Sequence, residues 1–320
     1  MKYHYVVFSY PRDYFRVMFQ EAIEKLNIEY ITDPIAYGKY GKFTEFLYHL
    51  HINKYLNWAF EIPFKQLWYK YYYRGEEKKN ICFVFLMDWV KPQKRGIVDA
   101  LKVRYPTARF VLYLEDLVSS HSFDIEEAKK FDLVITYDKG DAERYGYEFM
   151  PTFLSKIEIK ENNVPNSNCS FVGLAKNRVE LINTLYKKLI DAGLKCDFIV
   201  SGLKDKTKQI DGIKYIKRDI SYMEYLKHVD RTECIVELMQ KEATGYTLRT
   251  WEALLYGKKL LTNNLSLKNA SFYNPKQFIV FDDINEVDLG VLSESNNDFE
   301  YDDSDTSPIR FFEMIDNILR

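Results

Sequence analysis

Short apolar runs alternate with longer amphipathic stretches along most of the chain. In the first half, apolar runs that predict strands cover residues 3–8, 81–86, 110–114 and 133–136. The stretches between them carry apolar residues at helical spacing and predict helices over residues 14–26, 43–58, 93–103 and 125–130. Near-continuous apolar strands are typical of parallel sheets that are covered on both faces. Strand–helix alternation therefore predicts a doubly wound α/β domain.

A polar segment, ENNVPNSN at residues 161–168, interrupts this pattern and is the predicted linker. After it the alternation restarts, with strands predicted at 170–172, 197–200, 213–216, 234–238, 259–262 and 278–281 and helices at 177–192, 222–229 and 248–256. Pro308 predicts the start of a terminal helix, 308–319, that packs across the domain boundary. The sequence thus predicts two Rossmann-like domains, residues 1–160 and 161–320, whose parallel sheets face a central cleft.

Composition agrees with a globular two-domain protein. The chain has 320 residues, 47% of them hydrophobic and 29% charged. A net charge of −2 argues against a general nucleic-acid binder. The sequence contains no 18-residue apolar run and no signal-peptide pattern at its start, so we expect a cytoplasmic protein. Its four cysteines form no CxxC pair and are expected to be reduced.

The segment 242–264, EATGYTLRTWEALLYGKKLLTNN, has the most informative pattern. Gly245 and Thr247 precede a predicted helix, whose free N–H groups suit a phosphate. Arg249 lies in the first turn, where the helix dipole disfavours a cation unless an anion binds beside it. Glu252 lies on the same helix face and is expected to accept hydrogen bonds from ribose hydroxyls. The alternative is an ordinary capped helix with an Arg249–Glu252 surface pair.

A second segment, SFVGLAKNR at residues 170–178, opens the same predicted domain. Its strand ends at Gly173, and Lys176 and Arg178 follow in a short loop before a helix. Glycine allows close approach of the backbone to a ligand, and the two cations suit a diphosphate. We therefore expect both segments to serve one donor site.

The segment GYTLRTWEALLYGKKLLTNN resembles the donor-binding segment of bacterial GT-B glycosyltransferases that build lipopolysaccharide and capsular chains. VLYLEDLV at 111–118 and FDLVITYDKGDAERYGYEFMPTF at 131–153 resemble the N-terminal half of the same group. The resemblance implies a nucleotide-sugar donor in the C-terminal domain and a lipid-linked or polysaccharide acceptor in the N-terminal domain. It maps donor contacts onto Gly245, Thr247, Arg249 and Glu252.

Many retaining members of that group carry two glutamates eight positions apart near this helix. Here Glu242 and Glu252 are ten apart, and Glu237 has no glutamate eight positions later. The stereochemistry, retaining or inverting, therefore stays open.

An inverting transfer needs a general base near the acceptor hydroxyl. Asp116, Glu115, Asp13 and Asp88 follow predicted strands of the first domain. We favour Asp116, because a neighbouring Glu115 would raise one of the two carboxyl pKa values toward neutrality. The alternative is that Asp116 caps the following turn and Asp13 caps the first helix.

No metal or cofactor is expected. Asp303 and Asp305 match the Asp-x-Asp pattern of metal-dependent glycosyltransferases, but they lie in a polar stretch with no predicted strand before it. The five histidines lie outside the donor segment, which argues against a rival enzyme class, a two-Rossmann nucleotide-sugar epimerase. A non-enzymatic two-lobed nucleotide- or sugar-binding protein is a further alternative.

Two segments of the first domain suggest contact with an anionic membrane. Residues 63–74, PFKQLWYKYYYR, interleave aromatic residues with cations. Residues 91–109 contain six cations and one anion, a local charge of +5. A packed helix whose cations reach the solvent is the alternative.

Overall fold

The computed structural model describes residues 1–32, 40–53, 55–56, 63–75, 80–91, 94, 96–120, 123–239, 246–293, 299, 301–302 and 306–319. The chain divides into two compact units. Residues 1–155 and 306–320 form the N-terminal unit, and residues 156–305 form the C-terminal unit. Each unit contains one parallel six-stranded sheet covered by helices, so the α/β class predicted from the sequence is confirmed.

The sheet of the N-terminal unit has the order β2-β1-β3-β4-β5-β6. Its strands are β1 His4–Phe8, β2 Glu29–Ile31, β3 Ile81–Leu86, β4 Arg109–Leu114, β5 Leu133–Thr136 and β6 Glu148–Phe149. Strand β3, ICFVFL, is buried along its whole length, as expected for a central strand with helices on both faces.

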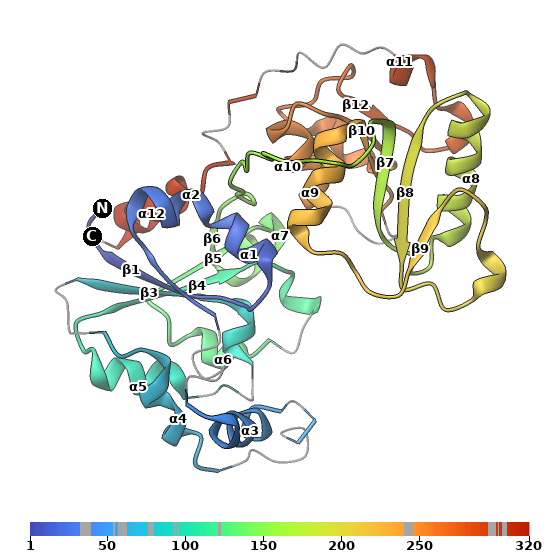
Figure 1. The fold of residues 1–320 in the computed structure, drawn as a ribbon. Coiled ribbons are helices and arrows are strands. Elements are labelled where there is room, and N and C mark those ends of the chain that lie inside the picture. Colours follow the sequence, from blue (N-terminus) through green and yellow to red (C-terminus); the bar gives the residue numbers. More distant parts are fainter. Residues whose placement is uncertain are drawn as a thin grey trace. The chain divides into compact units, whose positions relative to one another are not determined.

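Helices cover both faces of this sheet (Figure 1). On one face lie α1 Asp13–Met18, α2 Gln20–Leu26 and α12 Pro308–Ile318. On the other face lie α4 Gln66–Tyr72 and α5 Ile97–Arg104, with α3 Lys42–His51 beside α4. Two short helices, α6 Ile125–Ala128 and α7 Lys139–Tyr145, complete the unit. Strand residues alternate between the two faces. The ring centroid of Tyr5 in β1 lies 4.7 Å from that of Phe312 in α12, on one face. The ring centroid of Phe83 in β3 lies 5.4 Å from that of Tyr105, which follows α5 on the other face.

The helix predicted at 14–26 is broken at Phe19. Its backbone leaves the helical region there, and α1 and α2 meet at that residue. The Phe19 side chain is fully buried, with its ring 5.1 Å from that of Phe153 and 6.1 Å from that of Phe311. Burial of one aromatic ring therefore outweighs the continuity of the helical pattern.

The sheet of the C-terminal unit has the order β12-β11-β10-β7-β8-β9. Its strands are β7 Ser167–Leu174, β8 Cys196–Ser201, β9 Lys214–Ile216, β10 Thr232–Glu237, β11 Lys259–Thr262 and β12 Phe278–Val280. Strand β7 begins at Ser167, so the end of the predicted linker belongs to the sheet.

Two hydrophobic clusters lie on opposite faces of this sheet. Val236 packs with residues of α8 Val179–Asp191 and α11 Gly290–Ser293. Its strand neighbour Ile235 packs with residues of α9 Tyr222–Arg231 and α10 Leu248–Leu255. Side chains that alternate between the two faces thus form two cores. The loops and helix starts that follow the strands lie at the carboxyl edge of the sheet.

In each sheet the strand order reverses direction at one point. The reversal lies between β1 and β3 in the N-terminal unit and between β7 and β10 in the C-terminal unit. Open α/β sheets bind ligands at the carboxyl ends of the strands that flank such a point. These two edges are therefore where functional side chains are expected.

Candidate functional site

Two arginines lie at the β7–β10 reversal point. The Nη1 of Arg178, the residue before α8, donates to the carbonyl of Leu238, just beyond β10. Its Nη2 donates to the carbonyl of Leu174 at 3.3 Å. The Nη2 of Arg249, in the first turn of α10, donates to the carbonyl of Val172 in β7. Both guanidinium groups thus sit at the carboxyl ends of the two central strands.

The two guanidinium groups are close to each other. Their Cζ atoms lie 5.7 Å and 5.9 Å from the centroid of the Phe171 ring. Burial, and after it the charge of Arg249, lower the pKa of Arg178 to about 10. The Nε of Arg249 is buried and makes no hydrogen bond within the described part of the chain. Like charges at this range repel, and an anion that binds both groups removes the repulsion.

Gly173 makes room for this arrangement. A Cβ added at this residue would lie 3.0 Å from Nη2 of Arg249 and 3.8 Å from Nη2 of Arg178. The structure therefore brings together three of the residues expected to bind the donor, Gly173, Arg178 and Arg249. The glycine is needed for the approach of an arginine, in addition to any approach of a ligand.

Thr247 fixes the start of α10. Its Oγ1 accepts a hydrogen bond from the backbone N–H of Arg249 at 3.1 Å and donates one to the carboxylate of Glu237. Glu237 is 1% exposed, and it also accepts a bond from Oγ1 of Thr262 at 2.5 Å. The helix start is thereby tied to the ends of β10 and β11. Glu237 is not among the site residues predicted from the sequence. Its position as an acidic residue at the end of an apolar strand is the feature that could have indicated it.

Glu252 is completely buried, at 0% exposure. Its two carboxylate oxygens accept hydrogen bonds from the hydroxyls of Tyr222 at 2.7 Å and Tyr225 at 2.5 Å. Burial raises the pKa of Glu252 above its usual value, and the two tyrosine bonds partly offset this. The alternative of an exposed Arg249–Glu252 surface pair is therefore wrong. Because Glu252 is fully buried, contact with ribose hydroxyls would require the side chains that cover it to move.

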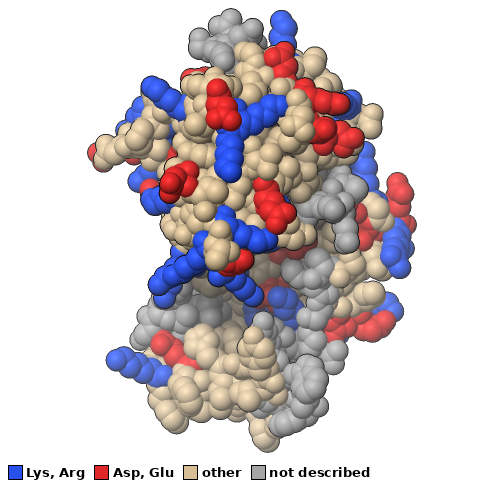
Figure 2. Space-filling view, turned by 90° about the vertical axis from the view of Figure 1, so that its right-hand side faces the viewer, with Lys and Arg blue, Asp and Glu red and all other residues tan. Residues whose placement is uncertain are grey.

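The structure does not bring the other two expected donor residues into this cluster, one of them because it is not described. Lys176 is exposed, and its backbone has a left-handed conformation with φ of 44°. Gly245 lies outside the described residues. On the face drawn in Figure 2, cationic side chains are interspersed with anionic ones. That face is therefore not uniformly basic.

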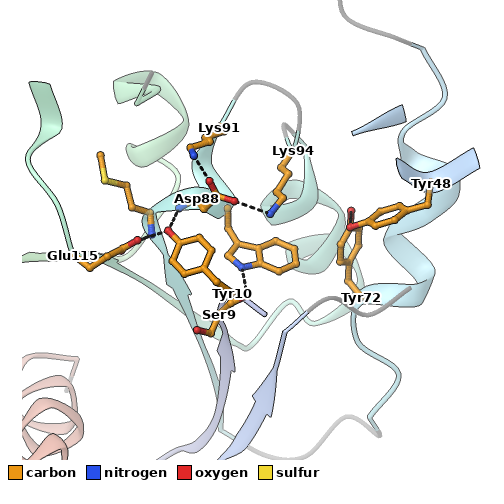
Figure 3. A network of polar contacts seen from close by, with 10 residues as sticks. Ser9, Tyr10, Tyr48, Tyr72, Asp88, Lys91, Lys94 and Glu115 are labelled. Atoms are coloured by element: carbon orange, nitrogen blue, oxygen red, sulfur yellow. Dashed lines mark hydrogen bonds and ion pairs between the residues drawn. The ribbon is translucent and has the colours of Figure 1, made fainter. Parts of the chain in front are cut away.

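A polar network occupies the β1–β3 reversal point of the N-terminal unit (Figure 3). The hydroxyl of Tyr10, which follows β1, donates to Oε1 of Glu115, which follows β4. The same hydroxyl accepts a bond from the backbone N–H of Asp88 at 2.6 Å. The N–H of Met87 donates to Oε2 of Glu115 at 2.9 Å. Three strand ends are thus linked through one carboxylate.

Burial raises the pKa of Glu115 to about 7, even though the bonds from Tyr10 and Met87 favour the charged form. Burial, and after it the charge of Glu115, also raise the pKa of Tyr10, which keeps its proton and donates. Burial would raise the pKa of Asp88 as well, but Lys94 and Lys91 hold it below the usual value. A carboxyl that titrates near neutrality beside a fixed anion is suited to accept a proton.

The other two carboxylates predicted for catalysis lie outside this network. Asp116 is half-buried, and its Oδ1 accepts a bond from the N–H of Leu117 at 2.8 Å. Asp13 is exposed in the first turn of α1 and accepts a bond from the N–H of Tyr14 at 3.1 Å. Glu115 is therefore the candidate that the geometry favours. Among the described residues, no group of three or more His, Cys, Asp or Glu side chains is placed to hold a metal ion.

The aromatic segment 63–74 is partly core. Trp68, Tyr72 and Tyr73 are buried, and the Nη1 of Arg104 in α5 donates to the carbonyl of Tyr73 at 3.3 Å. Phe64 and Leu67 are exposed. The alternative of a packed helix accounts for these buried rings. Within the part of the chain that the structure describes, no helix has the length and apolar character needed to cross a bilayer.

No protein-family model and no curated protein sequence matches the chain. Solved structures do match it over almost its whole length. An alpha-glucosyltransferase solved with UDP-glucose and DNA containing an abasic site has a TM-score of 0.56 and 13% identity, with 99% of each chain covered. An alpha,alpha-trehalose-phosphate synthase (UDP-forming) from Burkholderia vietnamiensis has a TM-score of 0.52 and 10% identity, covering 99% of this chain and 98% of that one. Likeness at this identity shows the fold, which is the GT-B fold of glycosyltransferases.

Proposed function

We propose that this protein is a glycosyltransferase that moves a sugar from a nucleotide-sugar donor to a lipid-linked or polysaccharide acceptor in bacterial surface glycan synthesis. The observation that carries the proposal is the convergence of Arg178 and Arg249 at the β7–β10 reversal point. Two adjacent cations, one with an unbonded buried Nε, suit the two phosphates of a nucleoside diphosphate. The GT-B fold, and similar enzymes solved with UDP-glucose or UDP, support the same donor class. The acceptor class rests on the resemblance of three sequence segments.

The donor site is proposed on the C-terminal unit. Arg178 and Arg249 bind the diphosphate, and the free N–H groups at the start of α10 add to this. Thr247 and Glu237 position that helix start through their hydrogen bond. Lys176, Gly245 and Glu252 remain predicted donor contacts, with Lys176 reaching the donor from the loop between β7 and α8.

The acceptor site is proposed on the N-terminal unit, with Glu115 as the general base. Its carboxylate takes the proton of the acceptor hydroxyl while that oxygen attacks the anomeric carbon. The bond from the anomeric carbon to the phosphate oxygen breaks, and the nucleoside diphosphate leaves with the electron pair. Arg178 and Arg249 stabilise the charge on the leaving group. This direct displacement inverts the anomeric centre. Asp116 and Asp13 are the alternative bases.

Release of nucleoside diphosphate tests the proposal. The protein is incubated with UDP- and GDP-activated sugars, with and without bacterial lipid extracts and surface oligosaccharides as acceptors. We expect acceptor-dependent release of UDP or GDP and a product heavier by one glycosyl unit. Interconversion of the donor sugar without an acceptor would instead indicate an epimerase, and tight donor binding without turnover would indicate a binding protein.

A further inference from the structure

Exposed apolar side chains gather in one segment of the N-terminal unit. Sixteen large apolar residues of the described chain are exposed, and seven of them lie between residues 43 and 67. They are Phe43, Phe46, Leu50, Tyr55, Leu56, Phe64 and Leu67. Scattered exposed apolar residues are normal, but a concentration of this kind marks a contact surface.

Three of these residues form one stripe on α3. Phe43 is 73% exposed, Phe46 61% and Leu50 40%. At about 100° per residue, positions i, i+3 and i+7 fall within about 60° of the helix circumference. Helix α3 is thus amphipathic with its apolar stripe turned toward solvent. We call Phe43, Phe46 and Leu50 the α3 stripe.

The opposite side of α3 holds the helix to its unit. Tyr48 is buried, with its ring 5.7 Å from that of Trp68 and its hydroxyl 3.2 Å from that of Tyr72 (Figure 3). The Nε1 of Trp68 donates to Nδ1 of His51 at 2.8 Å. Because aromatic and polar contacts anchor this side, the α3 stripe is held outward by the fold.

The charge around the stripe favours an anionic partner. The described residues 40–53, 55–56 and 63–74 contain four cations, Lys42, Lys65, Lys70 and Arg74, against one anion, Glu45, which is a net charge of +3. Lys42 is exposed in the first turn of α3, and Arg74 is exposed beyond α4. A second copy of this chain docked on the same face would bring two positive segments together, which electrostatics disfavours. A bilayer of anionic lipids accepts both the apolar stripe and the cations.

We propose that the α3 stripe inserts into the interface of an anionic lipid bilayer. Phe43, Phe46 and Leu50 enter the region between headgroups and acyl chains, and Lys42 pairs with lipid phosphates. The α3 stripe lies outside residues 63–74 and 91–109, the two segments for which membrane contact is predicted from the sequence. The inference does not rest on the proposed function.

Vesicle sedimentation tests this inference on the full chain. Vesicles of phosphatidylcholine with phosphatidylglycerol are compared with vesicles of phosphatidylcholine alone, at low and high salt. The test variant is Phe43→Ser with Phe46→Ser. The matched control is Ile190→Ser with Met223→Ser, which removes two exposed apolar residues from helices of the C-terminal unit. Lys42→Glu tests the charge, with the exposed Lys187→Glu as its control.

We expect salt-sensitive binding to the anionic vesicles only. The Phe43/Phe46 variant should bind about tenfold more weakly or worse, since each ring loses its apolar burial. Lys42→Glu should also weaken binding, while both controls keep it. Absence of binding, or equal loss in the Ile190/Met223 control, would overturn the inference. Wild-type dimers in light scattering that the Phe43/Phe46 variant abolishes, without vesicle binding, would assign the face to self-association instead. An unchanged circular dichroism melt excludes misfolding of the variants.

Discussion

Arg178 and Arg249 approach the same ring, that of Phe171, from the ends of two different strands, with their Cζ atoms 5.7 Å and 5.9 Å from its centroid. Arg178 precedes α8 and Arg249 lies in the first turn of α10, so the two are 71 positions apart in sequence. Both reach the point where the strand order of the sheet reverses. A diphosphate site at this point requires the close approach of these two like charges.

Gly173→Ala tests whether the approach requires a residue without a side chain. The added methyl group would lie 3.0 Å from Nη2 of Arg249, the far end of a flexible side chain. We expect a stability change below about 1 kcal/mol, because the arginine can move aside. The displaced arginine should weaken UDP binding about tenfold, since a charged hydrogen bond is worth about 1.5–3 kcal/mol. Calorimetric titration measures the binding.

Gly140→Ala is the control for that variant. Its added methyl group would meet a carboxylate oxygen of Asp138 in the N-terminal unit, at 3.1 Å. UDP binding should remain at the wild-type level in this control. Wild-type affinity in Gly173→Ala would show that Arg249 does not need its present position to bind the donor.

Thr247→Ala should destabilise the C-terminal unit. The change removes the cap of α10 and one of the two hydroxyls that bond the buried carboxylate of Glu237. Loss of a cap costs about 1 kcal/mol, and an unsatisfied buried acceptor costs about 1–3 kcal/mol. Thr247→Ser keeps the hydroxyl and should melt near the wild-type temperature. Equal melting temperatures for the Ala and Ser variants would show that the hydroxyl does not hold the helix start.

Glu115→Gln should remove a pH dependence of the transfer rate. Burial raises the pKa of Glu115 to about 7, so its basic form is populated above that pH and the wild-type rate should fall as pH drops below it. The glutamine variant should lose about 10²–10⁴ in rate at pH 8, with donor affinity nearly unchanged. Asp116→Asn, next to it in sequence, should keep most of the rate. The reverse ranking of these two variants would make Asp116 the base.

The same carboxyl predicts a difference in stability. Because the folded-state pKa of Glu115 lies above the ordinary value of 4.5, its contribution to stability is fully present below pH 4.5 and is lost as pH rises through 7. The melting temperature of Glu115→Gln should therefore rise relative to wild type between pH 5 and pH 8. A difference that does not change with pH would contradict the raised pKa.

Much of this architecture can be predicted from local sequence. The runs 81–86 and 133–136 are strands with the predicted bounds, because a buried parallel strand needs a continuous apolar run. Gly173 and Arg249 could be assigned to one site, since the carboxyl ends of parallel strands share an edge. Short strands such as β2 and β6 were not predicted, because their stability comes from the neighbouring strands rather than from a pattern of their own.

The parts that could not be predicted depend on contacts between distant residues. Tyr10 and Glu115 are 105 positions apart, and their hydrogen bond follows from the order of β1, β3 and β4 in the sheet. The preference for Asp116 over Glu115 came from sequence neighbours alone, which do not reveal which of two adjacent side chains turns toward Tyr10. Likewise, Trp68 and Tyr72 have an interfacial composition but pack against Tyr48 of α3. In each case the contact depends on how distant parts of the chain pack together, which local sequence does not show.

Calorimetric titration with UDP measures whether Arg249 contributes to binding of the donor diphosphate. Three proteins are compared: wild type, Arg249→Gln and Arg144→Gln, in which the replaced arginine is exposed on α7 of the other unit. We expect wild type and Arg144→Gln to bind UDP alike, and Arg249→Gln to bind more weakly by about 1.5–3 kcal/mol, the range for a charged hydrogen bond. Equal affinity of Arg249→Gln and wild type, or no binding of UDP or GDP by the wild type, would contradict a nucleotide-sugar site at Arg178 and Arg249.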